Sequence, residues 1–279
     1  MQLPTPRYTV TDDNHKYTIL MPDGAKIGPL KSVTTVLNVI DKPALKGWAA
    51  RMSADYFKKE ILKLGQRALD VATLEQIAKD AAKAHTVLAK DAADLGSACH
   101  DAFEAIILGK ELDVYPAALD EPIRAFKEWR LGPGSDIEIV DTETAVASVA
   151  HKAGGRLDAI GYSKQRGGWG IVDYKTSSGF YGNEYAYQVG GGYAMMVEEM
   201  FGIDVVWGEI IRFGKKPPYD SEGRPVTGMK DAQQGFLHAL GLVRHNEMKL
   251  IGTPSFTSAG KAVAAAPPAK AKKKSPVPF

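Results

Sequence analysis

The alternation of apolar and polar positions divides the chain into a short β-rich start, a helical middle and a mixed second half. Two alternating stretches, RYTV and KYTILM, predict strands near the N-terminus, with turn residues between them. From Ser32 to Leu131 the apolar positions recur with a helical period, and Ser32 itself can cap a short first helix. Longer helices are predicted at 43–64, 74–88, 91–108 and 121–129.

The second half of the chain alternates between strands and helices. Strands are predicted at 137–149, 155–163, 169–176 and 205–213, and helices at 184–200 and 231–250. This succession predicts an α/β (α+β) fold in which helices flank a mixed central β-sheet. The sequence contains no internal repeat.

Composition and charge separate a folded body from a tail. One domain is predicted over 1–254, and the Ala/Pro/Lys-rich residues 255–279 are predicted to be disordered. The body carries 30 basic and 33 acidic residues, whereas the tail carries five lysines and no acid. Affinity of the body for nucleic acid therefore requires a local groove. The tail lysines either add non-specific DNA affinity or only keep the tail in solution, and its end, SPVPF, is a candidate docking segment for a replication or recombination protein.

Residue usage excludes several classes of protein. Cys99 is the only cysteine, which excludes disulfides within the chain and an iron–sulfur cluster. No apolar run approaches the roughly 18 residues that span a bilayer. The start, MQLPTPRYTVTDD, lacks the apolar segment of a secretory signal. We therefore expect a cytoplasmic protein with no membrane partner.

Three charged residues interrupt two apolar strands in the segment GGRLDAIGYSKQRGGWGIVDYKTS. Because side chains alternate along a strand, Asp173 and Lys175 share one face of the second strand. A two-residue turn at Arg166-Gly167 would place Asp158 opposite Lys175 and Asp173 one diagonal away. The pattern fits either a salt bridge between strands, which contributes little net stability when buried, or a site for a hard cation such as Mg²⁺ or Mn²⁺.

Five motifs together resemble the PD-(D/E)XK nuclease superfamily. GRLDAIG followed by IVDYKTS resembles its core, in which an Asp on one strand precedes Asp/Glu-X-Lys on the next. SVTTVL, LGSACHDAFEAI and YQVGGGYAMM are similar to further motifs of the RecB-like branch and occur in the expected order. The blocks between residues 32 and 213 are similar to phage-encoded exonucleases and to the mitochondrial genome maintenance exonuclease.

The resemblance implies a restriction-endonuclease-like core at about 137–250, with the helical region at about 43–131 arching over the active site. It implies a Mg²⁺- or Mn²⁺-dependent deoxyribonuclease, an exonuclease that hydrolyses DNA from ends or single strands in phage replication, recombination or repair. The location is then the host cytoplasm. Three alternatives stay open: a structure-specific DNA endonuclease, a non-catalytic DNA-binding recombination accessory protein, and a metalloenzyme that does not act on nucleic acid.

The resemblance also implies roles for individual residues. Asp158, Asp173 and Lys175 would be catalytic, with Lys175 aligning the attacking water. The implied metal ligands are His100, Asp158, Asp173 and the carbonyl of Tyr174. Glu104 stands one turn after His100, and is either a partner that orients the imidazole or an ordinary surface acid. The remaining candidates for DNA contact or support of the site are Gln188, Tyr193, Thr176, Ser177, Lys46, Trp48 and Arg51. Glu143 is expected to face solvent.

Tyr193 follows Gln188 by five positions, where the motif it resembles has four. Positions five apart lie about 140° apart on a regular α-helix, so the two side chains share a face only if the helix bulges. Glycines at 190–192 fill the interval. Glycine is unfavourable inside a helix, which predicts close approach of a phosphate or a neighbouring strand, or a π-bulge.

Overall fold

The computed structural model describes residues 1–65, 70–112, 114–177, 179–180, 182–214 and 219–248. The tail predicted at 255–279 and the last residues of the helix predicted at 231–250 lie outside the described residues. The predicted α/β class is confirmed, because eight strands form one mixed sheet that helices flank.

One strand, β5, organises the sheet. The strands are β1 (Thr9–Asp13), β2 (Lys16–Leu20), β3 (Lys26–Ser32), β4 (Glu138–Ser148), β5 (Ala153–Ser163), β6 (Gly168–Lys175), β7 (Val205–Phe213) and β8 (Ser221–Pro225). They follow the order β1-β2-β3-β5-β6-β7-β8, and β4 also pairs along β5. β5 is antiparallel to β4 and β6, whereas the pairs β3–β5 and β6–β7 are parallel.

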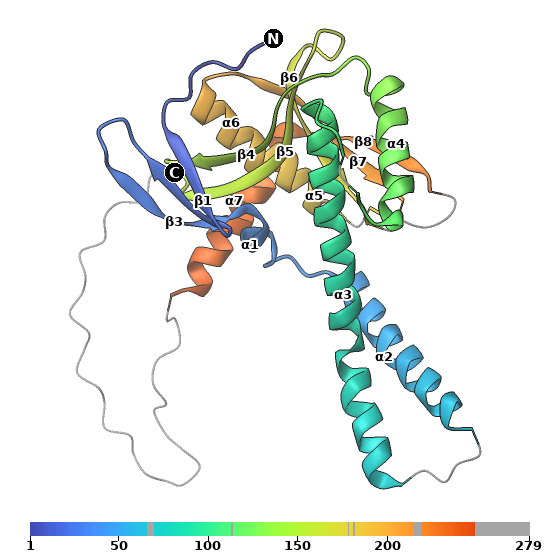
Figure 1. The fold of residues 1–279 in the computed structure, drawn as a ribbon. Helices are drawn as coiled ribbons and strands as arrows, with labels where there is room; N and C mark the ends of the chain where they lie inside the picture. The colour runs from blue at the N-terminus through green and yellow to red at the C-terminus, as the bar shows by residue number, and fades with distance from the viewer. Residues whose placement is uncertain (66–69, 113, 178, 181, 215–218, 249–279) are drawn as a thin grey trace, which may run out of the picture.

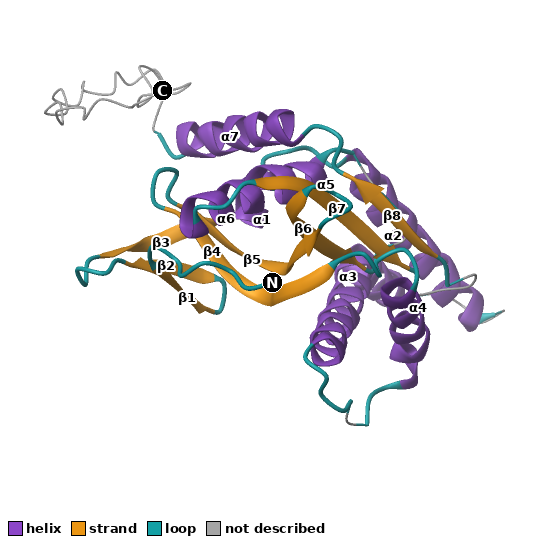
Figure 2. Cartoon of the chain, turned by 90° about the horizontal axis from the view of Figure 1, so that it is seen from above, coloured by secondary structure: helices purple, strands orange, loops and turns teal. Residues whose placement is uncertain are grey.

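Helices cover both faces of the sheet (Figure 2), and each face carries its own hydrophobic core. The helices are α1 (Val33–Leu37), α2 (Pro43–Leu64), α3 (Val71–Ile107), α4 (Asp120–Leu131), α5 (Glu184–Ala186), α6 (Ala194–Phe201) and α7 (Met229–Asn246), with a 3-10 turn at Ala117–Leu119 and a π-helical segment at Tyr187–Tyr193. One core joins α1, the π-helical segment, α6 and α7 to Ile160 and Ile171 of the sheet. The other joins α3 and α4 to Ala159 and Val172. Adjacent residues of β5 and β6 thus serve opposite cores, as strand alternation requires.

The helical middle of the chain forms a long hairpin. α2 and α3 pack against each other and extend away from the sheet (Figure 1). Among the described residues α2 buries no side chain, whereas α3 buries Cys99, Ala102 and Phe103 near its C-terminal end. The predicted break between helices 74–88 and 91–108 is wrong, because Ala89 and Lys90 are good helix formers and α3 continues through them. In the described part of the chain no helix combines the length and apolar character needed to cross a membrane.

The loop between β5 and β6 is longer than the predicted turn. Ser163 pairs with Gly168, so four residues, 164–167, form the loop instead of two. The Ser163 hydroxyl accepts a hydrogen bond from the backbone N–H of Arg166 (3.2 Å), and Gly167 adopts a φ of 90° that favours glycine. The register therefore differs by two residues from the predicted one, and a shift of two leaves every side chain on its predicted face.

Candidate active site

Three side chains from three different elements meet in one place. Candidate ligand atoms of His100 on α3, Glu143 on β4 and Asp158 on β5 all lie within 4.8 Å of one another. Nδ1 of His100 lies 3.4 Å from Oδ1 of Asp158 and 3.7 Å from Oε1 of Glu143. We call these three residues the His–Glu–Asp group.

Packing of α3 on the sheet positions His100. Its neighbour Cys99 is buried, and Phe103, one turn further on, stacks on Phe126 of α4 with ring centroids 4.3 Å apart. Phe103 also meets Tyr174 of β6 edge to face at 5.7 Å. His100 lies at the margin of this aromatic core, with its ring 6.3 Å from Tyr174. α3 thus places the imidazole of His100 at the edge of the core, where a quarter of the His100 side chain is exposed.

The β5–β6 register sets Asp158 beside Asp173. Ala159 pairs with Val172, so the next positions along the two strands are the two aspartates. Oδ2 of Asp158 accepts a hydrogen bond of 2.6 Å from the backbone N–H of Tyr174, which ties this carboxylate to β6. The predicted pairing of Asp158 with Lys175 is therefore wrong. The shared strand face of Asp173 and Lys175 is as predicted, and these two side chains form the ion pair instead.

Asp173, which is fully buried, and Lys175, which is mostly buried, form a charged pair. Nζ of Lys175 contacts Oδ2 of Asp173 and also lies 5.2 Å from the centre of the Tyr185 ring. Burial raises the pKa of Asp173 to about 6, and the positive charge of Lys175 partly opposes this rise. Burial lowers the pKa of Lys175, but the charges of Asp173 and Asp158 outweigh it and raise the pKa above its usual value.

The charges of the His–Glu–Asp group stabilise one another. Burial lowers the pKa of His100, yet the charge of Asp158 and hydrogen bonding with Asp158 and Glu143 raise it to about 10. Burial raises the pKa of Asp158, but the neighbouring His100 and Lys175 bring it below its usual range. The same contacts place Nδ1 of His100 between two carboxylates, where a neutral imidazole could share a cation with them.

The donor set fits a divalent cation. Carboxylate oxygens suit Mg²⁺ and Mn²⁺, and an imidazole nitrogen is a common ligand of transition metals. Oδ1 of Asp173 is buried and has no hydrogen-bond partner in the part of the chain that the structure describes. A buried acceptor of this kind is costly unless a cation or water meets it. The His–Glu–Asp group could hold the ion, with Asp173 and the Tyr174 carbonyl next to it as further candidates.

A π-helix brings Gln188 and Tyr193 together. Residues 187–193 form a π-helical segment, and Nε2 of Gln188 donates a hydrogen bond to the Tyr193 hydroxyl (3.2 Å). The bulge that the five-residue spacing required is therefore present. Burial raises the pKa of Tyr193 well above its usual value. A Cβ at Gly155 of β5 would lie 2.8 Å from the Tyr193 ring, so that glycine makes room for it.

The glycines of the π-helix admit a neighbouring helix. A Cβ at Gly191 would lie 2.5 Å from the Ala232 carbonyl oxygen and 2.7 Å from Cβ of Phe236, both on α7. At Gly192 it would lie 2.9 Å from Val33 of α1. The close approach predicted for these glycines is thus made by helices and not by a strand.

Three other predicted residues lie near the end of β6 or on α3. Thr176 and Ser177 follow β6 and are partly buried, and the Ser177 hydroxyl donates a hydrogen bond to the Gly179 carbonyl (2.9 Å). Glu104 is partly buried on α3 and is not a member of the His–Glu–Asp group.

The three predicted residues of α2 lie on its first half. Trp48 is partly buried, whereas Lys46 and Arg51 are exposed. An ion pair of 2.9 Å between Lys42, at the start of α2, and Glu184 ties this end of the helix to α5. The first half of α2 is thereby linked to the segment that leads into the π-helix.

Glu143 was expected to face solvent, and this expectation is wrong. Its side chain is about four-fifths buried and lies beside His100. The residue has a φ of 50°, a left-handed conformation that is rare for glutamate inside a strand. Apolar and polar spacing carries no signal for such a kink, so the sequence pattern could not identify Glu143 as part of the site.

Comparisons with known proteins add little to this geometry. No family model and no curated protein matches the sequence. Among solved structures, an alkaline exonuclease (LHK-Exo) from Laribacter hongkongensis is similar over 52% of this chain and 78% of its own, with 11% sequence identity and a TM-score of 0.27. We assign no residue of this chain from that likeness.

Proposed function

We propose that the chain is a divalent-metal-dependent nuclease that hydrolyses phosphodiester bonds of DNA. The observation that carries the proposal is the position of the His–Glu–Asp group beside the buried Asp173–Lys175 pair. A salt bridge alone would need one acid and one base, and would leave Oδ1 of Asp173 without a purpose. A cation site next to a buried lysine accounts for all five side chains.

The surroundings of each side chain support a role. The three members of the His–Glu–Asp group would hold the cation, with Asp173 as a further ligand, and the ion would supply a Lewis acid that stabilises charge on phosphate oxygens. Lys175 carries three N–H donors and no acceptor, so it orients the attacking water and cannot itself bind the cation. The ion pair with Asp173 fixes the position of the Lys175 ammonium. Gln188 is hydrogen-bonded to Tyr193, which lies near enough to Asp173 and Asp158 for their charges to help raise its pKa.

We further propose an exonuclease that takes single strands or DNA ends along the helical region at 43–131. Lys46 and Arg51 are exposed on the half of α2 that Lys42 ties to α5, where they could follow phosphates while Trp48 stacks on a base. A structure-specific endonuclease would use the same chemistry on branched DNA. A non-catalytic binding protein would not need the complete Asp158, Asp173 and Lys175 set.

Cleavage of end-labelled oligonucleotides tests the chemistry. We expect digestion with Mg²⁺ or Mn²⁺, none after EDTA treatment, and loss of digestion in Asp158→Ala and Asp173→Ala. Asp94→Ala is the matched control, because Asp94 is exposed on α3 and, among the described residues, its ion pair is with Lys90. Undiminished cleavage by a metal-free preparation, or a near wild-type rate in either aspartate variant, would contradict the proposal.

Substrate topology tests the mode of attack. If a strand must enter by its end, a linear single-stranded oligonucleotide is degraded while a covalently closed circle of the same sequence survives. Equal loss of both substrates would identify an endonuclease. Binding of DNA without cleavage under any metal would identify the accessory protein.

A further inference from the structure

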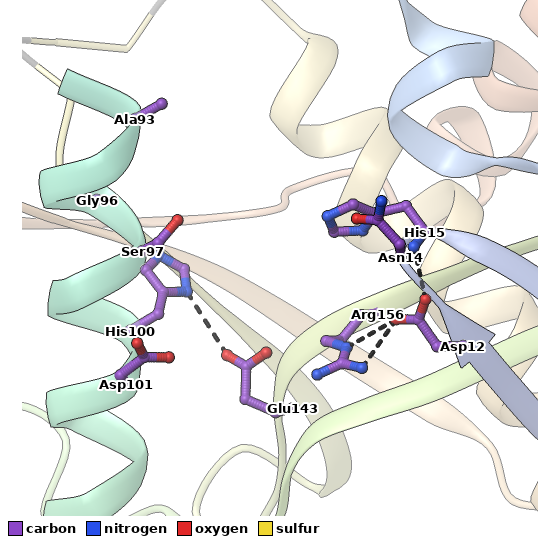
Figure 3. A pocket seen from close by; sticks show the side chains of 10 residues that line it. All are labelled: Asp12, Asn14, His15, Ala93, Gly96, Ser97, His100, Asp101, Glu143 and Arg156. Atoms are coloured by element: carbon purple, nitrogen blue, oxygen red, sulfur yellow. Dashed lines mark hydrogen bonds and ion pairs between the residues drawn. The ribbon is translucent and has the colours of Figure 1, made fainter. Parts of the chain in front are cut away.

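A cleft of about 410 Å³ opens directly beside the His–Glu–Asp group. His100 and Glu143 line it together with residues that lie outside the His–Glu–Asp group and the Asp173–Lys175 pair (Figure 3). One wall is α3, with the small residues Ala93, Gly96 and Ser97, and the opposite wall is the β1–β2 turn and the start of β5. Any group that fills the cleft would therefore lie next to the candidate metal ligands.

Arg156 is the cation of the opposite wall. It stands two residues before Asp158 on β5, and 43% of its side chain is exposed. Oδ2 of Asp12, whose side chain is only 6% exposed, accepts a hydrogen bond from Nε of Arg156 (3.0 Å) and forms an ion pair with its Nη2 (2.8 Å). The guanidinium is thus held in one orientation.

The two N–H donors of Nη1 take no part in these contacts. Figure 3 shows one guanidinium nitrogen pointing away from Asp12, on the side of Glu143. No hydrogen bond from Nη1 reaches another residue within the described part of the chain. A braced guanidinium with free donors at the edge of a cleft suits a planar or tetrahedral oxyanion, which it can contact with two parallel bonds.

The β1–β2 turn is shaped toward the same cleft. Asn14 and His15 form a two-residue turn with φ values of 49° and 63°, and both line the cleft. Glycine is favoured at the second of these positions, so the histidine there carries a cost in backbone strain. The backbone N–H of His15 donates to Oδ1 of Asp12 (2.8 Å), so one carboxylate positions both Arg156 and the turn.

We propose that this cleft is a phosphate subsite, in which Arg156 binds a phosphate of the DNA strand next to the one that is cleaved. The inference rests on the proposed nuclease function. Ser97, Asn14 and His15 supply further hydrogen-bonding groups around the Arg156 donors, while Asp101 lies exposed at the rim. Glu143 would repel a phosphate unless its charge is shared with a cation, so the subsite fills together with the metal site.

The test measures equilibrium binding of single-stranded oligonucleotides in a Lys175→Ala background, where the strand stays intact in Mg²⁺. One neutral methylphosphonate linkage is moved along the strand, and terminal phosphates are present or absent. Binding should weaken roughly tenfold when the phosphate facing Arg156 is neutral or missing. Arg156→Gln should weaken binding of the unmodified strand by a similar factor and no longer respond to that replacement. The salt dependence should lose about 0.7 in the slope of log K against log salt.

Two controls keep the result interpretable. Arg124→Gln removes an arginine of similar exposure, held by Glu121 and Glu128 on α4, and should bind as the background does. The double variant Asp12→Asn/Arg156→Gln removes both charges of the Asp12–Arg156 ion pair. If the folded double variant still binds weakly, the defect cannot come from a buried Asp12 carboxylate that has lost its partner.

The outcomes separate the subsite from the function. If Arg156→Gln binds within twofold of Arg124→Gln and still responds to the neutral linkage, the subsite is refuted while the nuclease stands. If no variant, including the background, binds any oligonucleotide, both the subsite and the proposed function fail.

Discussion

Gly191→Ala should destabilise the protein although it removes a helix-breaking residue. The added Cβ would lie 2.5 Å from a backbone carbonyl oxygen and 2.7 Å from a Cβ, both on α7, where neither atom can rotate away. Overpacking of this kind costs up to about 3 kcal/mol, and replacing glycine by alanine in a helix returns about 1 kcal/mol. We therefore expect a net loss of about 2 kcal/mol of unfolding free energy.

Thermal unfolding measures this loss. For a domain of this size about 2 kcal/mol corresponds to a decrease in Tm of roughly 4–8 °C. Gly241→Ala is the matched control, since Gly241 also lies in a helix, α7, and a Cβ there meets nothing within 4 Å. That variant should gain up to about 1 kcal/mol. If Gly191→Ala is as stable as Gly241→Ala, close packing of the π-helix on α7 is not the reason for the glycine.

Three further perturbations probe separate parts of the molecule. Lys175→Ala should lower the single-turnover cleavage rate by roughly 10²- to 10⁴-fold while DNA binding is kept; a destabilised variant with an intact rate would remove Lys175 from the mechanism. Glu143→Gln should weaken Mn²⁺ binding in calorimetry by roughly 10- to 100-fold, and unchanged affinity would exclude Glu143 as a ligand. Ser32→Ala should cost about 1 kcal/mol in denaturant unfolding, because the Ser32 hydroxyl accepts a hydrogen bond from the Thr35 N–H (3.0 Å); no change would show that this cap is not needed.

The elements with a strong apolar period were predictable. The helix starting at Pro43, the strands around Asp158 and Asp173, and the cap at Ser32 follow from local pattern and turn chemistry. The sequence did not reveal β3 or β8, which read KIGPLKS and SEGRP. Both contain Gly, Pro and charged residues, and they become strands only because the neighbouring β2 and β7 offer edges to pair with.

The details of the site depended on contacts between distant residues. Arg166, in the β5–β6 loop, donates a hydrogen bond to Asp136 (2.7 Å) and also forms an ion pair with Glu209. These distant partners stabilise a four-residue loop, which the sequence of the loop alone does not predict. Because the loop has four residues and not two, Asp158 lies opposite Asp173 and not opposite Lys175. The π-helix was different, because the glycines and the five-residue spacing already pointed to it.

The unbroken course of α3 has a mechanical consequence. The helix is anchored near Cys99, and its other end at Val71 is about 42 Å away at 1.5 Å per residue. A tilt of about 5° about that anchor would swing the outer end by about 4 Å, yet would move a residue within one turn of the anchor by about 0.5 Å or less. His100 lies next to Cys99, at the anchored end of α3. A tilt of this size would therefore displace the far end of the hairpin by several ångströms and leave the distances from the imidazole to Asp158 and Glu143 almost unchanged.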